Sequence, residues 1–399
     1  MCSESESLSV IRKTSKIFSK YTWPGSVVKL FPKLLRIASP YKNATRLYNT
    51  SACPAGHHRR TVMRGKTLSE LASSAFKEHR RLVAPLAGFP GVELIGSTIK
   101  LAQQNFGEHY KAIRSLVDSY SPDLVFPLMD LSVEANALGR YTVFPRGESA
   151  TVPKDTFDMG ELESLSRINI TFDTRLMGYV ETIKMMSVSL PPSTLRGAYV
   201  VGPFTLAALM MGADDAVIST ILDTEKLHRL CHFTTERIQE YVQLLLASGA
   251  DVICILEPTA VMLSPEQFSE FSAIYVHHIT TSFKYSGANF VYHTCGNTMH
   301  LAEKMARAGV HGVSLDSKDA GVDLPAVAKR LPQDVAVIGN ISPATTMRFA
   351  SPAEVSREVG ELLKEMERFP NFVLSTGCDL PQETPPQNIR AFMEAGRAW

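Results

Sequence analysis

The 399-residue chain contains no run of about 18 apolar residues without charge, the length that a transmembrane helix requires. Cysteine is scarce, with six residues in the whole chain, and their spacing is not that of a secreted disulfide framework. Asp and Glu are missing between Ser7 and Ser69, a stretch with 13 Lys and Arg residues. We therefore expect no transmembrane segment and a reducing compartment, and we treat the acid-free stretch separately.

Residues 1–66 form a basic N-terminal extension whose composition is typical of a mitochondrial transit peptide. Arg-Leu-Tyr at residues 46–48 resembles a matrix-peptidase cleavage context. Three alternatives remain open: a membrane-surface helix over residues 27–37, a disordered tail, or a true start at Met63. We expect the protein to lie in the cytoplasm or the mitochondrial matrix.

The remainder of the chain is acidic, with 28 basic and 38 acidic residues after residues 1–66 are removed. An acidic body argues against nucleic acid as a general partner, because binding to phosphates needs a basic surface. The composition, 45% hydrophobic and 20% charged, is that of a globular protein with a large core.

Short apolar runs alternate with longer amphipathic stretches from residue 67 onward, such as the helical pattern over residues 225–246. This alternation implies parallel strands with right-handed crossovers, and eight strands favour a single closed (β/α)₈ TIM barrel. A doubly wound sheet is the alternative, although no Gly-x-Gly-x-x-Gly follows the first strand. The expected strands span residues 81–86, 124–128, 196–201, 251–256, 289–292, 312–315, 335–338 and 372–374.

Candidate metal ligands stand at the ends of two expected strands. His293 and Cys295 are two residues apart, so in extended backbone both side chains point the same way and can grip one ion. Cys378 would add a third ligand from a neighbouring strand. Two thiolates and one imidazole suit Zn²⁺, and three protein ligands leave a fourth position for a substrate. The alternative is that the cysteines are small buried hydrophobic residues.

Other polar residues also follow expected strands, at the barrel end where this fold carries its chemistry. We take four of them as catalytic candidates: Asp130, Glu257, Asp316 and Asn340. The alternative is that the acidic residues cap helices and that Asn340 serves a turn.

Several motifs over residues 67–399 resemble the uroporphyrinogen decarboxylase-like superfamily, whose fold is the barrel expected above. Within it, the chain looks most like the zinc methyltransferases that pass a methyl group from a methylated corrinoid protein to the thiol of coenzyme M. The motifs are Gly202-Pro203-Phe204-Thr205-Leu206, Glu257-Pro258-Thr259-Ala260, His293-Thr294-Cys295-Gly296-Asn297, Ser314-Leu315-Asp316, Gly339-Asn340-Ile341-Ser342-Pro343, and Gly377-Cys378 with Thr384-Pro385-Pro386.

The resemblance implies that the candidate ligands hold Zn²⁺, with Glu257 first and Asp316 second as candidates for a fourth ligand. It implies a methylcobamide donor, presented by a corrinoid protein at the barrel mouth, and a small-molecule thiol as acceptor. The targeting-like N-terminus leaves open another thiol, such as homocysteine, or another donor. We expect the cofactor to contact Gly202, Pro203 and Thr205.

Two other functions remain as alternatives. True decarboxylases of this superfamily carry an Arg-rich loop after the first strand, to pair with the carboxylates of the tetrapyrrole, whereas residues 84–90 contain no Arg. They also have a His where this chain has Cys378, although Asp130 matches their catalytic Asp. The second alternative is a non-enzymatic protein that binds a corrinoid or a tetrapyrrole.

Overall fold

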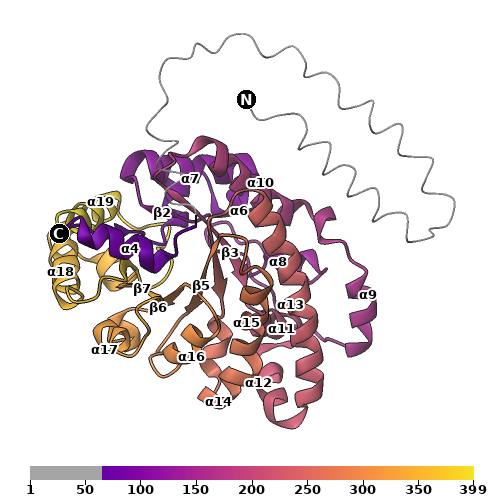
Figure 1. Cartoon of the computed structure of the whole chain (residues 1–399). Coiled ribbons are helices and arrows are strands. Elements are labelled where there is room, and N and C mark those ends of the chain that lie inside the picture. Colours follow the sequence, from indigo (N-terminus) through magenta and orange to yellow (C-terminus); the bar gives the residue numbers. More distant parts are fainter. Residues whose placement is uncertain (1–64) are drawn as a thin grey trace, which may run out of the picture. The chain divides into compact units, whose positions relative to one another are not determined.

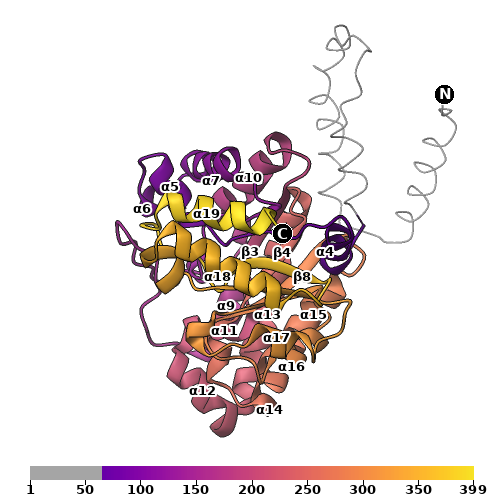
Figure 2. The same ribbon diagram turned by 90° about the vertical axis from the view of Figure 1, so that its left-hand side faces the viewer.

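The computed structural model describes residues 65–399, in which eight parallel strands are surrounded by helices (Figures 1 and 2). The strand order β1-β8-β7-β6-β5-β4-β3-β2 and the alternation with helices confirm the (β/α)₈ barrel. The predictions for the N-terminal extension, including transit and location, fall almost wholly outside the described residues. The strands are β1 Leu82–Val83, β2 Leu124–Val125, β3 Leu195–Val201, β4 Val252–Leu256, β5 Asn289–Thr294, β6 Gly312–Leu315, β7 Ala336–Ile341 and β8 Phe372–Thr376.

The helices form the outer layer and the two ends of the barrel, with short 3₁₀ and π segments between some of them. They are α4 Leu68–Lys77, α5 Gly88–Leu94, α6 Ile99–Gln104, α7 Phe106–Tyr120, α8 Val133–Ala137, α9 Leu162–Ser166, α10 Thr174–Ser189, α11 Pro203–Met211, α12 Ala213–Leu222, α13 Thr224–Ala247, α14 Pro265–Phe268, α15 Ile274–Ser282, α16 Ala302–Arg307, α17 Leu324–Ala328, α18 Pro352–Glu365 and α19 Pro386–Arg397.

The barrel closes at a seam between β1 and β2, the two shortest strands, which do not pair with each other as strands. Asp123 bridges them instead. Its backbone N–H donates to the carbonyl oxygen of Val83 (3.0 Å), and its carboxylate accepts the N–H of Val83 (2.9 Å). The other seven neighbouring pairs are parallel ladders.

Side chains alternate between the inside of the barrel and the layer under the helices, as strand geometry requires. On β4, Val252, Cys254 and Leu256 belong to the inner cluster, whereas the residues between them pack under the helices. Helix α4 fills the end of the barrel where the strands begin, because its apolar residues join the inner cluster and the Leu68 N–H donates to Asn289 at the start of β5 (2.7 Å). The opposite, carboxyl end of the strands is therefore the end available for a site.

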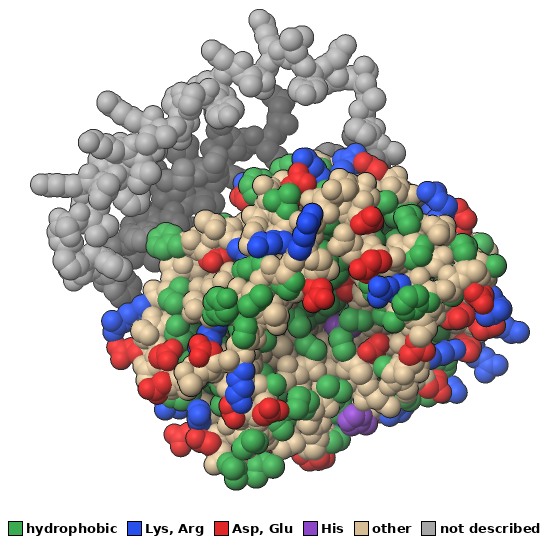
Figure 3. Space-filling model, turned by 180° about the vertical axis from the view of Figure 1, so that it is seen from behind, with side chains coloured by type: hydrophobic (Ala, Val, Ile, Leu, Met, Phe, Trp, Pro, Cys, Tyr) green, Lys and Arg blue, Asp and Glu red, His purple; other side chains and the backbone are tan. Residues whose placement is uncertain are grey.

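No single helix of residues 65–399 is long and apolar enough to cross a membrane; helices α11 and α12 reach that length and composition only as a pair bent by 108°. On the coloured part of the face seen in Figure 3, acidic and basic side chains are intermixed. The described part of that face shows no continuous basic area of the kind that a nucleic-acid partner would need.

Candidate metal centre

His293, Cys295 and Cys378 come together at the carboxyl ends of β5 and β8, as the sequence predicts. The Sγ atom of Cys295 lies 3.3 Å from Nε2 of His293 and 3.5 Å from Sγ of Cys378. The third side of the triangle, from Cys378 Sγ to His293 Nε2, is 3.8 Å. His293 is buried, whereas Cys295 and Cys378 are only partly buried as residues.

The triangle has the size that a zinc ion needs. Tetrahedral bonds of about 2.3 Å to sulfur and about 2.0 Å to nitrogen place two sulfurs about 3.8 Å apart and a sulfur and a nitrogen about 3.5 Å apart. The three observed distances, 3.3, 3.5 and 3.8 Å, lie close to these values. The donor set and its spacing therefore fit Zn²⁺ without rearrangement of the backbone.

Ser314 on β6 orients the imidazole of His293. Its hydroxyl lies 3.0 Å from Nδ1, the ring nitrogen that faces away from the thiols. If Nδ1–H donates to this hydroxyl, the lone pair of Nε2 points into the cluster, which is the usual arrangement for a metal-binding histidine. Sequence analysis gave Ser314 no role of its own. In the structure Ser314 lies directly opposite His293 in the ladder between β5 and β6.

Asp316 holds the loop that carries Cys295. One carboxylate oxygen accepts the N–H of Gly296 (2.7 Å), and the other accepts the N–H of Ser317 (2.6 Å). Asp316 does not belong to the cluster of potential ligands, and neither does Glu257. Among the described residues, the fourth position therefore has no acidic side chain in place.

Glu257 is fully buried and caps the start of helix α11. Its carboxylate accepts the N–H groups of Phe204 (3.0 Å) and Thr205 (2.9 Å) and the hydroxyl of Thr205 (2.7 Å). Burial raises the pKa of this carboxyl to about 7, although the hydrogen bonds lower it. Glu257 thus caps a helix, which is the alternative role considered for it. The capped helix is α11 after β3, and not the helix that follows Glu257 after β4.

The residues expected to contact a cofactor, Gly202, Pro203 and Thr205, are all buried, and the hydroxyl of Thr205 donates to Glu257. A Cβ atom at Gly202 would lie 2.1 Å from the Glu257 side chain, so only glycine fits there. Asn340 is also buried and donates from Nδ2 to the carbonyl oxygens of Asp316 (2.9 Å) and Val322 (3.3 Å). A direct role of these four residues in catalysis or cofactor binding stays a prediction.

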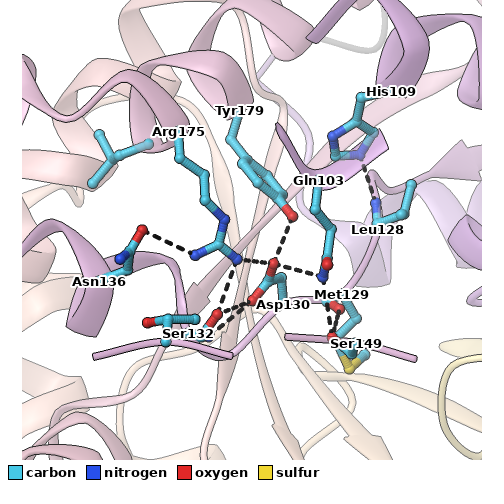
Figure 4. A network of polar contacts seen from close by, with 12 residues as sticks. Gln103, His109, Leu128, Met129, Asp130, Ser132, Asn136, Ser149, Arg175 and Tyr179 are labelled. Atoms are coloured by element: carbon cyan, nitrogen blue, oxygen red, sulfur yellow. Dashed lines mark hydrogen bonds and ion pairs between the residues drawn. The ribbon is translucent and has the colours of Figure 1, made fainter. Parts of the chain in front are cut away.

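Asp130 is the centre of a separate buried network (Figure 4). Its carboxylate forms an ion pair with Arg175 of α10, and its side chain is 0% exposed. The same carboxylate accepts hydrogen bonds from Gln103 (2.7 Å) and Tyr179 (2.9 Å), and from both the N–H (3.0 Å) and the hydroxyl (2.7 Å) of Ser132. Burial lowers the pKa of Arg175, but Asp130 raises it, with a net rise. Both carboxylate oxygens of Asp130 are thus engaged within the protein.

Tyr199 and Asp379 are two polar residues beside the cluster that sequence analysis did not single out. Tyr199 points into the barrel from β3 and stacks on Phe126, with ring centroids 4.6 Å apart. Its hydroxyl and both carboxylate oxygens of Asp379 are buried without a hydrogen-bond partner. The only sequence signal was the position of Asp379 directly after Cys378.

The neighbours of Asp379 shift the pKa of its carboxyl in opposite directions. Burial and the neighbouring Cys378 raise the pKa of its carboxyl, whereas the backbone amides of Gly88, Leu380 and Met129 approach it and lower the pKa; the net shift is upward. The N–H of Leu380 is already donated to the carbonyl oxygen of Leu86 (2.8 Å). The three amides thus lie near the carboxyl, but neither of its oxygens has a hydrogen bond of ordinary length and angle.

Comparison with known proteins assigns this barrel to a family. The family model described as uroporphyrinogen decarboxylase (URO-D) matches residues 103–399, which is most of the chain. The chain belongs to the URO-D family. This confirms the resemblance found in the sequence motifs and, because the family consists of enzymes, favours an enzymatic role.

The relatives of this URO-D family member have two different activities. Uroporphyrinogen decarboxylase of Prochlorococcus marinus (strain NATL1A) is 31% identical over 207 residues, which are 50% of this chain and only 57% of that relative. The methylcobamide:CoM methyltransferase MtbA of Methanosarcina acetivorans is 26% identical over 243 residues, 60% of this chain and 68% of MtbA. Among solved structures, a methyltransferase from Methanosarcina mazei shares the fold, with a TM-score of 0.74 at 21% identity over 83% of this chain and 98% of that chain.

Proposed function

We propose that the protein transfers a methyl group from a methylated corrinoid to the sulfur of a small-molecule thiol. The observation that carries the proposal is the triangle of His293, Cys295 and Cys378, whose donor spacing fits a tetrahedral zinc ion with one open position. Similarity to MtbA supports the same chemistry, including a corrinoid protein as the partner that presents the methyl group.

When bound, Zn²⁺ would lower the pKa of a thiol in the fourth position, so that the substrate sulfur reacts as a thiolate. The corrinoid would supply a methyl group on cobalt: the sulfur would take this methyl group with its own lone pair, the electron pair of the cobalt–carbon bond would stay on cobalt, and the proton of the thiol would go to solvent. Ser314 and Asp316 serve this step indirectly, because they fix the ring of His293 and the loop of Cys295.

Decarboxylation of a tetrapyrrole is less well supported by the same residues. A substrate with many carboxylates needs cations, but the segment at residues 84–90 contains no Arg or Lys. The carboxylate of Asp130, the residue that matches the catalytic Asp of decarboxylases, is fully engaged by Arg175 and its other partners.

The test is the zinc content of the purified full-length protein, with methylcobalamin demethylation measured against a set of thiols and uroporphyrinogen decarboxylation measured in parallel. We expect about one zinc per chain and thiol-dependent demethylation, both lost in Cys378→Ala. Cys231→Ala is the matched control, because Cys231 is buried on α13 outside the cluster. A wild-type protein without zinc, or one that decarboxylates the tetrapyrrole and ignores thiols, would refute the proposal.

A further inference from the structure

Two buried polar side chains next to the metal cluster have no partner within the protein. The hydroxyl of Tyr199 forms no hydrogen bond although this residue is only 7% exposed, and neither carboxylate oxygen of Asp379 has a partner. Buried polar groups are nearly always paired, because an unpaired one loses its bonds to water without compensation. Other buried side-chain atoms of the described residues also lack a partner, but these two groups lie beside the candidate metal centre and are therefore candidate contacts for a ligand.

These two residues are contiguous with the metal cluster. Asp379 follows Cys378 directly, and the ionisable groups that act on Tyr199 are Asp379, Cys254 and Cys378, none of which is a cation. The buried arginine on the adjacent helix α10 is paired with Asp130 and belongs to another network. The unpartnered oxygens are hydrogen-bond acceptors with no cationic side chain among these neighbours, so they favour a ligand that brings donors and positive charge.

We propose, on the basis of the methyl transfer proposed above, that Asp379 and Tyr199 bind the amine of the acceptor, which is then an aminothiol. A primary ammonium group carries three N–H donors, which match the two oxygens of Asp379 and the one oxygen of Tyr199. A sulfonate or carboxylate tail would instead face a carboxylate with no cation to balance it. The pair thus selects against anionic thiols as well as for aminothiols.

The experiment compares thiols that share one two-carbon chain and differ only in the tail: 2-aminoethanethiol, 2-mercaptoethanol and 2-mercaptoethanesulfonate, with 3-aminopropanethiol to vary the reach. For the full-length wild-type protein, we expect kcat/KM of methylcobalamin demethylation to be roughly 10- to 100-fold higher for the better amine than for the sulfonate, the range of one or two charge-assisted hydrogen bonds. Asp379→Asn should reduce the preference for the amine over the hydroxyl compound roughly tenfold. Tyr199→Phe should reduce it by a smaller factor.

A binding measurement separates recognition of the tail from the reaction. In protein loaded with Co²⁺ in place of zinc, the visible spectrum changes when a thiolate joins the metal, so the Kd of each thiol can be titrated without a methyl donor. We expect the same order of thiols, and the same loss of amine preference in Asp379→Asn. Asp319→Asn is the matched control, because Asp319 is an exposed aspartate bonded to Ser342 and Thr345 outside the site.

The outcomes distinguish the two proposals. If thiols bind and react but the sulfonate equals or exceeds the amines, the aminothiol inference is refuted while methyl transfer stands. The same holds if Asp379→Asn keeps the wild-type order. If no thiol changes the cobalt spectrum or is methylated, both proposals fall. If either variant fails to fold, the comparison of thiols with the wild-type protein decides by itself whether the acceptor is an aminothiol.

Discussion

Replacement of Arg175 by methionine tests whether Asp130 is a structural or a catalytic residue. The pair is almost completely inaccessible, with 7% of the arginine side chain and none of the aspartate exposed. Removal of one partner from a buried ion pair typically costs about 3–5 kcal/mol, since the remaining charge is left without compensation. Four hydrogen bonds from Gln103, Tyr179 and Ser132 would still solvate the carboxylate, so we expect the lower end of the range, about 3 kcal/mol.

The assay is urea unfolding of the full-length protein, with the loss read as a shift in midpoint at constant slope. Asp130→Asn should also destabilise the protein, because two donors, Arg175 and Gln103, would then face an amide group. The double variant should cost less than the sum of the two single changes, as expected for residues in direct contact. If Asp130 is a structural residue, any loss of activity in these variants should parallel their loss of stability. If Arg175→Met unfolds within about 1 kcal/mol of wild type, or if Asp130→Asn abolishes activity in a protein of wild-type stability, the structural role is refuted.

Three further changes test the support of the site and the fold around it. Ser314→Ala should weaken zinc binding roughly 10- to 100-fold in a chelator competition, because the imidazole loses its orienting partner. Gly377→Ala should reduce zinc content and stability, since its Cβ would lie 2.4 Å from the backbone nitrogen of Ser317, whereas Gly360→Ala on α18 meets no atom within 4 Å and should be neutral or stabilising. Burial raises the pKa of Glu134 to about 8 from 4.5, so the folded state holds a proton that the unfolded state loses. Its contribution to stability therefore declines as pH rises from about 4.5 through about 8, and Glu134→Gln should flatten this part of a pH series of unfolding free energies.

The barrel was predictable because its strands are short apolar runs between clear amphipathic helices. All eight predicted strands are present, and β6 has the predicted bounds. The differences have local causes. Strands β1 and β2 have only two residues each, because the seam is bridged by Asp123 rather than by a ladder. Strand β5 continues two residues beyond its prediction, through His293 and Thr294, since its polar end still pairs with β6.

The proximity of the three candidate ligands was predictable for a related reason, the period of two along an extended strand. This period puts His293 and Cys295 on one side, and the parallel barrel brings Cys378 to the same end. Capping was among the predicted alternatives for the acidic residues, but their partners were not predictable. Asp130 pairs with an arginine 45 residues later in the chain, and Glu257 caps a helix that begins 54 residues before it; such contacts follow from the tertiary fold, and no local pattern encodes them.

The acidic residues at the mouth of the barrel differ in one respect that bears on the reaction. Asp130 is neutralised by an arginine, Glu257 is bound by the start of a helix, and Asp316 is bound by two backbone amides. Each is held in a position where it stabilises other elements of the site. Asp379 alone among them has buried carboxylate oxygens without a hydrogen bond of ordinary length and angle, and it directly follows Cys378 of the candidate metal centre. Because the other acids are engaged in this way, we propose that Asp379 recognises the amine of the acceptor and that His293, Cys295 and Cys378 carry the reaction.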